Sequence, residues 1–192
     1  MALDLGVKHK FSDEWGGGLS VRPGFYGDFQ SLNSDSFTAP VRLLATFKQS
    51  ATLGWIFDGE YNAFADMAFV PVVILNWQAD AQWTFSLGFP SSSIRYQATD
   101  KLTLRAEASS ERNSYRINDN PAPAPLPNLG HTYLDYREIR VGVGADYALT
   151  RSLSLSADTG VLLQRQFDYY ARSYRMDGDT GAYVLLSAML KF

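Results

Sequence analysis

Apolar and polar residues alternate with a period of two along most of the 192-residue chain. The clearest stretch is 152–164, where leucine, alanine, threonine and valine alternate with mostly polar residues or glycine. The stretches 3–8, 102–109 and 138–147 repeat this pattern. Because successive side chains of a β-strand point to opposite faces, the period predicts strands with one apolar and one polar face. We find no convincing helical period, so we expect a single all-β domain spanning residues 1–192.

The connections between these strands come in two alternating lengths. We expect strands at 2–11, 15–27, 38–48, 52–58, 70–77, 83–89, 92–98, 102–117, 132–148, 153–169 and 180–192. Tight turns with a common Ser/Thr pattern are expected at 11–15, 98–102 and 149–153, with looser versions at 48–52 and 78–82. Long loops are expected at 28–36, 58–68, 118–130 and 171–179. The short pair 83–89 and 92–98 is interpreted either as a low hairpin or as one that folds inward.

Short turns at one end and long loops at the other are typical of transmembrane β-barrels. We therefore predict an antiparallel up-and-down transmembrane β-barrel of about 10–12 strands. The first predicted strand runs toward a short turn, so in an even-numbered barrel a strand before residue 1 is expected to be missing. Two alternatives to a missing strand are that the barrel closes in an unusual way or that a strand from a partner replaces it.

The two faces of the predicted strands carry different chemistry. Tryptophans near strand ends on the apolar faces predict an aromatic girdle, formed by Trp15, Trp55, Trp77 and Trp83. Charged residues on the polar faces predict an ion-paired lumen network, formed by Asp4, Lys8, Arg42, Arg105, Glu107, Glu138, Arg140, Asp146 and Asp158. We favour a structural role for this network, because unpaired buried charge is costly, over a solute conduit.

The end of the chain resembles the C-terminal signal strand of outer-membrane proteins. Apolar residues alternate up to a final aromatic residue, as Leu186, Ala188, Leu190 and Phe192 show. The resemblance implies that the barrel assembly machinery recognises this strand during biogenesis.

A further resemblance rests on Trp15-Gly16-Gly17-Gly18-Leu19-Ser20-Val21-Arg22-Pro23-Gly24-Phe25-Tyr26-Gly27-Asp28-Phe29 and on Phe89-Pro90-Ser91-Ser92-Ser93-Ile94-Arg95-Tyr96, followed by the turn at 99–102. These segments resemble a family of uncharacterised Gram-negative outer-membrane barrels, a domain of unknown function. The resemblance implies a fold and a bacterial outer-membrane location but no activity. Its members usually carry a signal peptide and further N-terminal sequence, neither of which we expect within this sequence.

Composition excludes several classes of function. Seventeen Lys and Arg against twenty Asp and Glu give a formal net charge of −3, which argues against a nucleic-acid partner. There is no cysteine and there are two separated histidines, so we expect neither a metal site nor a cofactor. The longest apolar stretch, 67–79, is shorter than the ~20 residues of a membrane-spanning helix.

Candidate catalytic residues are few. His131 is followed by Thr132 and Asp135, and Ser173 falls in another predicted loop, but the sequence has no Gly-x-Ser-x-Gly motif that would activate a serine. We therefore expect no enzymatic activity.

The pattern predicts an integral outer-membrane component whose long loops contact lipopolysaccharide, outer-membrane lipids or another membrane protein. The first alternative is a narrow porin-like channel for small solutes. The second is a soluble lipocalin-like binder, which would require the apolar faces to point inward.

Overall fold

The computed structural model describes residues 1–28, 33–121, 125–150 and 152–190, and within them the protein is all-β. A 12-stranded antiparallel sheet is accompanied by one two-stranded sheet. The strands of the large sheet are β1 (Leu5–Lys10), β2 (Trp15–Val21), β5 (Val41–Lys48), β6 (Leu53–Tyr61), β7 (Phe69–Gln78), β8 (Trp83–Phe89), β9 (Ser91–Thr99), β10 (Leu102–Ile117), β11 (Thr132–Ala148), β12 (Leu153–Tyr169), β13 (Tyr174–Gly178) and β14 (Gly181–Leu190). The small sheet pairs β3 (Gly24–Phe25) with β4 (Phe37–Thr38), and short 3-10 turns lie at η1 (Ser34–Ser36) and η2 (Tyr170–Arg172). No helix of the described residues is long and apolar enough to cross a membrane.

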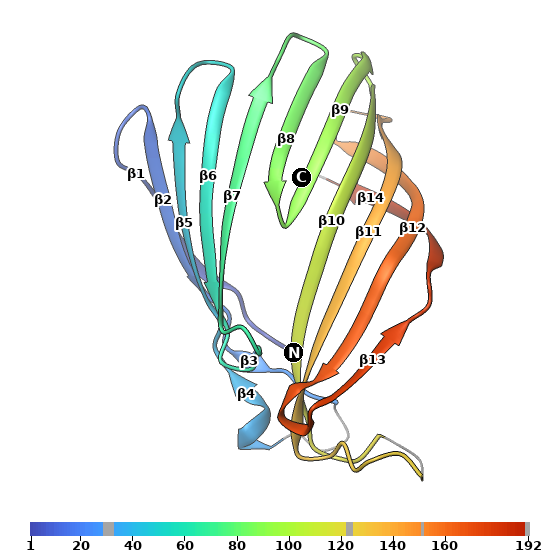
Figure 1. Cartoon of the computed structure of the whole chain (residues 1–192). Coiled ribbons are helices and arrows are strands. Elements are labelled where there is room, and N and C mark those ends of the chain that lie inside the picture. The colour runs from blue at the N-terminus through green and yellow to red at the C-terminus, as the bar shows by residue number, and fades with distance from the viewer. Residues whose placement is uncertain (29–32, 122–124, 151, 191–192) are drawn as a thin grey trace.

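The large sheet is up-and-down, because each strand from β5 to β12 pairs with its neighbour in the chain. It curves strongly (Figure 1), and its two edges are formed by β1 and by β13 together with β14. Both β13 and β14 pair with β12, β13 beside the half nearer the long loops and β14 beside the other half. In the described part of the chain, no hydrogen-bonded ladder joins β1 to β14, so the sheet has two free edges.

One end of the sheet, here called the turn end, carries five tight turns with the same local structure. In the predicted turns 11–15, 98–102 and 149–153 the second residue, and in 48–52 and 78–82 the third residue, is Ser, Thr or Asp. Its side-chain oxygen accepts hydrogen bonds from the backbone N–H groups two and three residues later, at 2.7–3.3 Å. Such side-chain bonds are the reason that these residues favour turns. The oxygens belong to Ser12, Ser50, Asp80, Thr99 and Thr150.

The structure confirms four predicted strands to the residue: 83–89, 102–117, 132–148 and 153–169. Other predicted strands have different bounds at the end of the sheet opposite the turn end, here called the loop end. The predicted strand 15–27 stops at Val21, before Pro23, and the one at 38–48 begins only after Pro40, since proline cannot donate to a ladder. The predicted loop 58–68 is too long, because β6 continues to Tyr61. The predicted loop 171–179 is also too long, because it contains β13. The hairpin of β8 and β9 stays in the wall and is shorter than its neighbours at the loop end (Figure 1).

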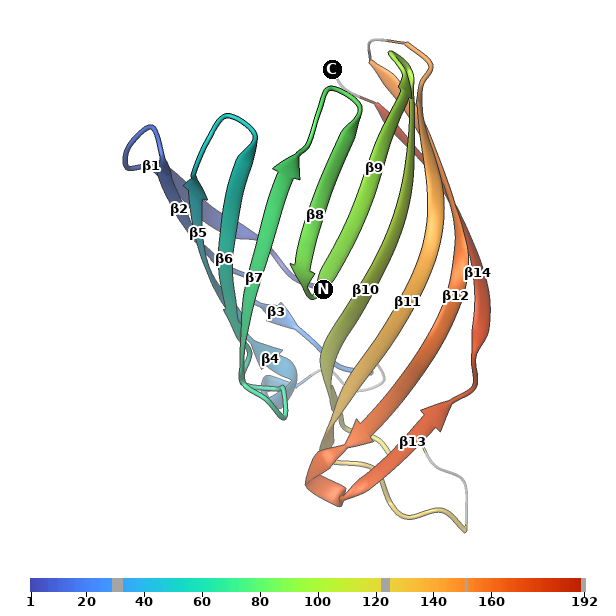
Figure 2. The same cartoon turned by 45° about the horizontal axis from the view of Figure 1, so that its top comes forward.

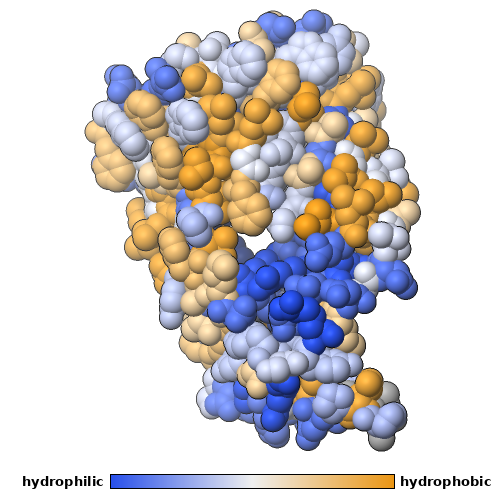
Figure 3. All heavy atoms as spheres, viewed as in Figure 1, coloured by the Kyte–Doolittle hydropathy of each residue, from blue (hydrophilic) through white to orange (hydrophobic). Residues whose placement is uncertain are grey.

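The apolar residues lie on the convex, outward face of the sheet and are exposed. Val143 and Leu186, for example, expose 58% and 74% of their surface. The described residues bury only four large hydrophobic side chains, and all of them are at the loop end: Phe64, Ile117, Leu129 and Tyr169. Figure 3 shows the outward apolar surface in orange, and a blue charged zone follows it toward the loop end. Among the described residues, no hydrophobic core therefore fills the space enclosed by the sheet.

The described parts of 22–40, here called the cap segment, run across the loop end from β2 to β10 (Figure 2). Gly27 forms a parallel bridge with Arg116, whose N–H donates to the carbonyl of Tyr26 at 2.8 Å. The amide of Asn118 donates to the fully buried Ser36 hydroxyl at 2.9 Å. Since β2 and β10 are far apart in the strand order, the cap segment ties two distant parts of the wall together.

Candidate functional site

The outward apolar surface forms a belt of nearly constant height. On β11 it covers residues 139–147, and the outward positions nearer the loop end, Asp135 and Arg137, are charged. Nine residues is the length of a membrane-spanning β-strand, which needs about 9–11. The predicted girdle residues Trp15, Trp77 and Trp83 lie exposed in the turn-end half of the belt, and Trp55 is half-buried there. Aromatic neighbours pack against them, with Trp15–Phe47 and Trp83–Tyr96 ring centroids 4.6 and 4.7 Å apart.

The predicted lumen network divides into separate groups, of which the largest surrounds Arg105 on the inward face. Its guanidinium contacts Asp146 at 2.9 Å and also binds Asp158, which is 8% exposed. Glu107 approaches the same guanidinium at 3.8 Å. Register explains this grouping, since Arg105 and Asp158 lie opposite Gly144 from its two sides. We call these four charged residues the inner network.

A second group on the inward face surrounds Arg140. Its guanidinium donates to Glu138 at 2.6 Å and to Glu111 at 2.8 Å. The Arg140 guanidinium carbon lies 5.8 Å from the ring centroid of Tyr183, a cation–π distance. The Tyr183 ring covers Gly160, where an added Cβ would overlap the backbone of β11. Glycine is therefore required there by close approach.

The remaining predicted lumen residues do not join these groups. Arg42 pairs with Asp58 across β5 and β6, and Asp4 meets Arg22 at 3.5 Å near the loop end. Lys8 has no ion pair with any described residue. The nine predicted residues thus form several local pairs, and the structure does not gather them into one site.

Sequence reasoning missed a third group, which lies outward just beyond the belt and is here called the outer cluster. The Nε of Arg112 donates to both carboxylate oxygens of Asp135 at 2.9 Å. Arg137 and Ser114 donate to the same carboxylate at 3.2 and 3.0 Å, and Asp135 is fully buried. Burial disfavours the charged form of Asp135 and opposes a low pKa. The hydrogen bonds and positive charge of Arg112, together with the hydrogen bonds from Ser114 and Arg137, outweigh burial and lower the pKa of Asp135. The members of the outer cluster lie on the loop-end parts of β10 and β11, where both faces of each strand are polar. The sequence there shows no alternation of apolar and polar residues that could identify them.

The structure does not assemble the residues considered for catalysis. Asp135 is occupied by two arginines and Ser114, and no hydrogen bond joins it to His131 within the described residues. His131 and Ser173 both have left-handed backbone conformations, with φ of 50°.

The predicted assembly residues are partly described. Leu186, Ala188 and Leu190 are exposed on β14 and pair with the outward positions of β12. Phe192 lies outside the described residues.

The inner network makes one glycine substitution a specific test. A Cβ at Gly144 would overlap the Asp158 carboxylate and lie 3.0 Å from Arg105 Nε, whereas a Cβ at Gly54 would have no neighbour closer than 3.5 Å. We expect Gly144→Ala to separate the pair and to lower the free energy of unfolding by about 1–3 kcal/mol. Urea titration of the detergent-folded protein measures this, with Gly54→Ala as the matched control. Equal midpoints for the two variants would contradict this packing.

A family model described as a domain of unknown function, DUF6268, matches residues 1–176. No curated protein and no solved structure matches the chain. The family description names no activity, so any function has to be argued from the geometry.

Proposed function

We propose that this chain, which belongs to the family described as Domain of unknown function (DUF6268), is a non-enzymatic β-barrel protein of the bacterial outer membrane. In this proposal its loop end faces outward and contacts lipopolysaccharide or another membrane protein. The barrel assembly machinery inserts it through β14.

The observation that supports this proposal is the exposed apolar belt. An antiparallel sheet in water covers its apolar face, whereas here that face is convex and its polar face is concave. A belt about nine residues high, with tryptophans near its turn end and charges beyond its loop end, suits a bilayer. A lipocalin-like binder would need the opposite arrangement of faces.

A structural or interaction role is favoured over a channel by the loop end. The cap segment crosses this end and is anchored through Gly27 and Ser36 to β10 and the residues that follow it. The charged side chains of the inner network are held by one another, which suits a fixed wall.

Closure of the sheet into a barrel is part of the proposal. In a bilayer the backbone groups of a free edge would lack hydrogen-bond partners, at a cost of several kcal/mol each. Strands β1 and β14 both run toward the turn end, so one additional strand running the opposite way would be antiparallel to both. Direct parallel pairing of β1 with β14 is the alternative closure.

The test is the mobility of detergent-refolded protein on a gel, with and without boiling, beside its β-content by circular dichroism. We expect a folded, heat-shifted band that forms only with detergent or lipid. A monodisperse β-rich protein without detergent would overturn the proposal. Steady, ion-selective conductance in planar bilayers that changes in Arg140→Ala would replace the structural role with a channel.

A further inference from the structure

The inward face of the sheet carries a polar hollow on β7 to β10, here called the inner pocket. Its volume is about 280 Å³, just below the ~300–1,000 Å³ that is usual for ligand sites. Its uncharged lining residues are all serine, threonine or asparagine, and its two charged residues are Arg95 and Glu107. The short side chains leave the hollow, so it suits a small ligand that forms many hydrogen bonds.

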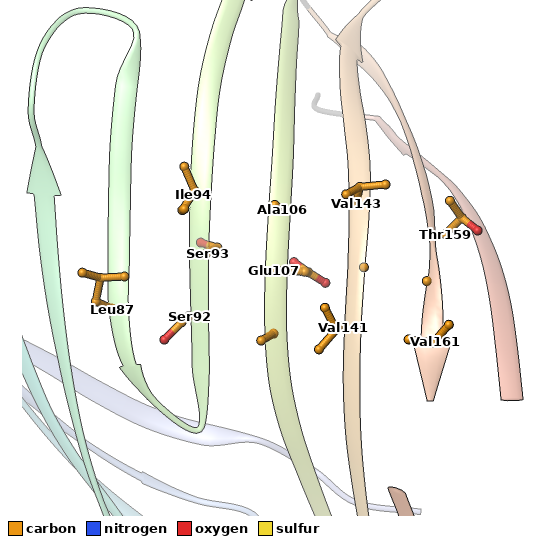
Figure 4. A pocket seen from close by; sticks show the side chains of 13 residues that line it. Leu87, Ser92, Ser93, Ile94, Ala106, Glu107, Val141, Val143, Thr159 and Val161 are labelled. Carbon is orange, nitrogen blue, oxygen red and sulfur yellow. The ribbon is translucent and has the colours of Figure 1, made fainter. Parts of the chain in front are cut away.

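Strand register brings the lining residues together in one row across four strands. Asn76 lies opposite Ser86, which in turn lies opposite Ser93. Ser93 lies opposite Glu107, and Figure 4 shows these two residues side by side on β9 and β10. Arg95 occupies the next position on the same face of β9, toward the turn end. Since these four strands pair with one another directly, the inner pocket does not depend on how the edges of the sheet close.

The Glu107 carboxylate in this pocket is poorly satisfied by the protein. The nearest guanidinium is that of Arg105, but its Nε donates to Asp158 at 3.0 Å and its Nη1 donates to Asp146 at 2.9 Å. Glu107 keeps only a 3.8 Å contact to Arg105, and no hydrogen bond joins its side chain to another described residue. Its side chain is 34% exposed, so a ligand in the pocket can reach it.

The Arg95 guanidinium is the second poorly satisfied charge. Among the described residues it takes part in no ion pair and no side-chain hydrogen bond, and it is exposed. It also lies directly opposite Arg105 in the register, where like charges are destabilising. A carboxylate bound to Arg95 would offset this repulsion and would accept two charge-assisted hydrogen bonds from the planar guanidinium.

The two charges have opposite signs and occupy diagonal positions of the β9–β10 pair, which lie about 7–8 Å apart. We propose that the inner pocket binds a small zwitterion of the α-amino acid type. Its carboxylate binds Arg95, its ammonium group binds Glu107, and Ser93, which neighbours both, hydrogen-bonds to the ligand.

The charges around the pocket favour a zwitterion over a simple anion. The three carboxylates of the inner network outnumber the guanidinium groups of Arg95 and Arg105, so the surroundings already carry a net negative charge. An anion without an ammonium group would gain the contact with Arg95 and would be repelled by Glu107.

Binding of L-serine tests the inference, because its hydroxyl group matches the lining and it is small enough for the pocket. Two further ligands each lack one of its charges: L-glycerate has a hydroxyl group in place of the ammonium group, and ethanolamine has no carboxylate. Equilibrium dialysis of each labelled ligand against the protein folded in a maltoside detergent gives the dissociation constants. We expect L-serine to bind about tenfold more tightly than either of the others.

Two variants remove the charged partners one at a time. Arg95→Gln removes the partner of the carboxylate, and its control is Arg22→Gln, at an exposed ion pair outside the pocket. Glu107→Gln removes the partner of the ammonium group, and its control is Glu60→Gln, at a partly exposed position of β6 outside the pocket. Both pocket variants alter partly exposed side chains, so we expect them to fold as the parent does, which the heat-shifted band checks.

We expect the affinity for L-serine to fall about tenfold in Arg95→Gln and in Glu107→Gln and to stay unchanged in the controls. Equal affinities in all variants, or L-glycerate binding as tightly as L-serine, would overturn the zwitterion site. Absence of L-serine binding by the folded parent would also overturn it, while leaving the proposed membrane barrel intact. Folding without detergent would overturn the membrane proposal instead, and the same dialysis in plain buffer would still decide the inference.

Discussion

Removal of the Asp135 carboxylate is expected to destabilise the protein more than any other single charge change. Asp135→Ala leaves the guanidinium groups of Arg112 and Arg137 without their shared partner, and Asp135 itself is fully buried. Breaking a buried pair in this way costs about 3–5 kcal/mol. Because Arg112 and Arg137 are partly exposed, we expect about 3 kcal/mol, measured by urea unfolding of the detergent-folded protein at pH 7.

The matched control is Asp13→Ala, because Asp13 pairs with Lys10 at 2.6 Å on the exposed turn end. An exposed pair contributes between 0 and about 1 kcal/mol, so this variant should unfold almost as the parent does. If Asp135→Ala and Asp13→Ala gave the same midpoint, the outer cluster would not be a stabilising element.

Acid should reproduce part of this loss in the unmodified protein. The folded pKa of Asp135 is lowered, so its contribution is complete above its ordinary pKa of about 4 and is lost as the pH falls through the lower folded value. Asp135→Ala should therefore show a shallower loss of stability below about pH 4.

Placing a charge on the apolar belt is expected to have the second largest effect, and only in lipid. Leu43 is 59% exposed on the outward face of β5. A cation on the lipid face of a barrel costs about 2–4 kcal/mol near the midplane. Leu43→Arg should therefore lower the free energy of folding into lipid vesicles by about that amount, as read from urea titrations.

Leu126→Arg is the control, since Leu126 is an equally apolar, 45% exposed residue in the loop 118–131, outside the belt. We expect it to fold into vesicles as the parent does. If both variants folded equally well, the exposed leucines would not face lipid, and the membrane proposal would lose its main support.

The alternation predicted the fold well wherever a strand has one apolar and one polar face. It fails for β13, because the alternation in Tyr174–Gly178 covers only five residues within an expected polar loop. This strand is held by its pairing with β12, including the ion pair of Arg175 with Asp168. It also fails at β6, whose last residues, including Glu60, lie within the expected polar loop. Local pattern thus locates strands in the belt, and long-range pairing decides where they end.

The charged groups show the same division. The alternation of faces along a strand predicts that Arg105 and Asp158 point inward. It does not predict which residues they pair with, because that depends on the register of β10, β11 and β12. The outer cluster required Arg112 and Ser114 of β10 to be brought beside Asp135 of β11 by the pairing of the two strands. Nothing in a one-dimensional pattern contains that information.

The five capped tight turns have a consequence for how the protein folds. Each contains its own cap within a few residues, so a hairpin such as β11–β12 can form from contacts that are close in sequence. Contacts of short sequence separation form fastest, because little loop entropy is lost. The hairpins at the turn end can therefore form early, as independent units, and the cap segment, which joins residues such as Ser36 and Asn118, can settle only after the wall between them exists.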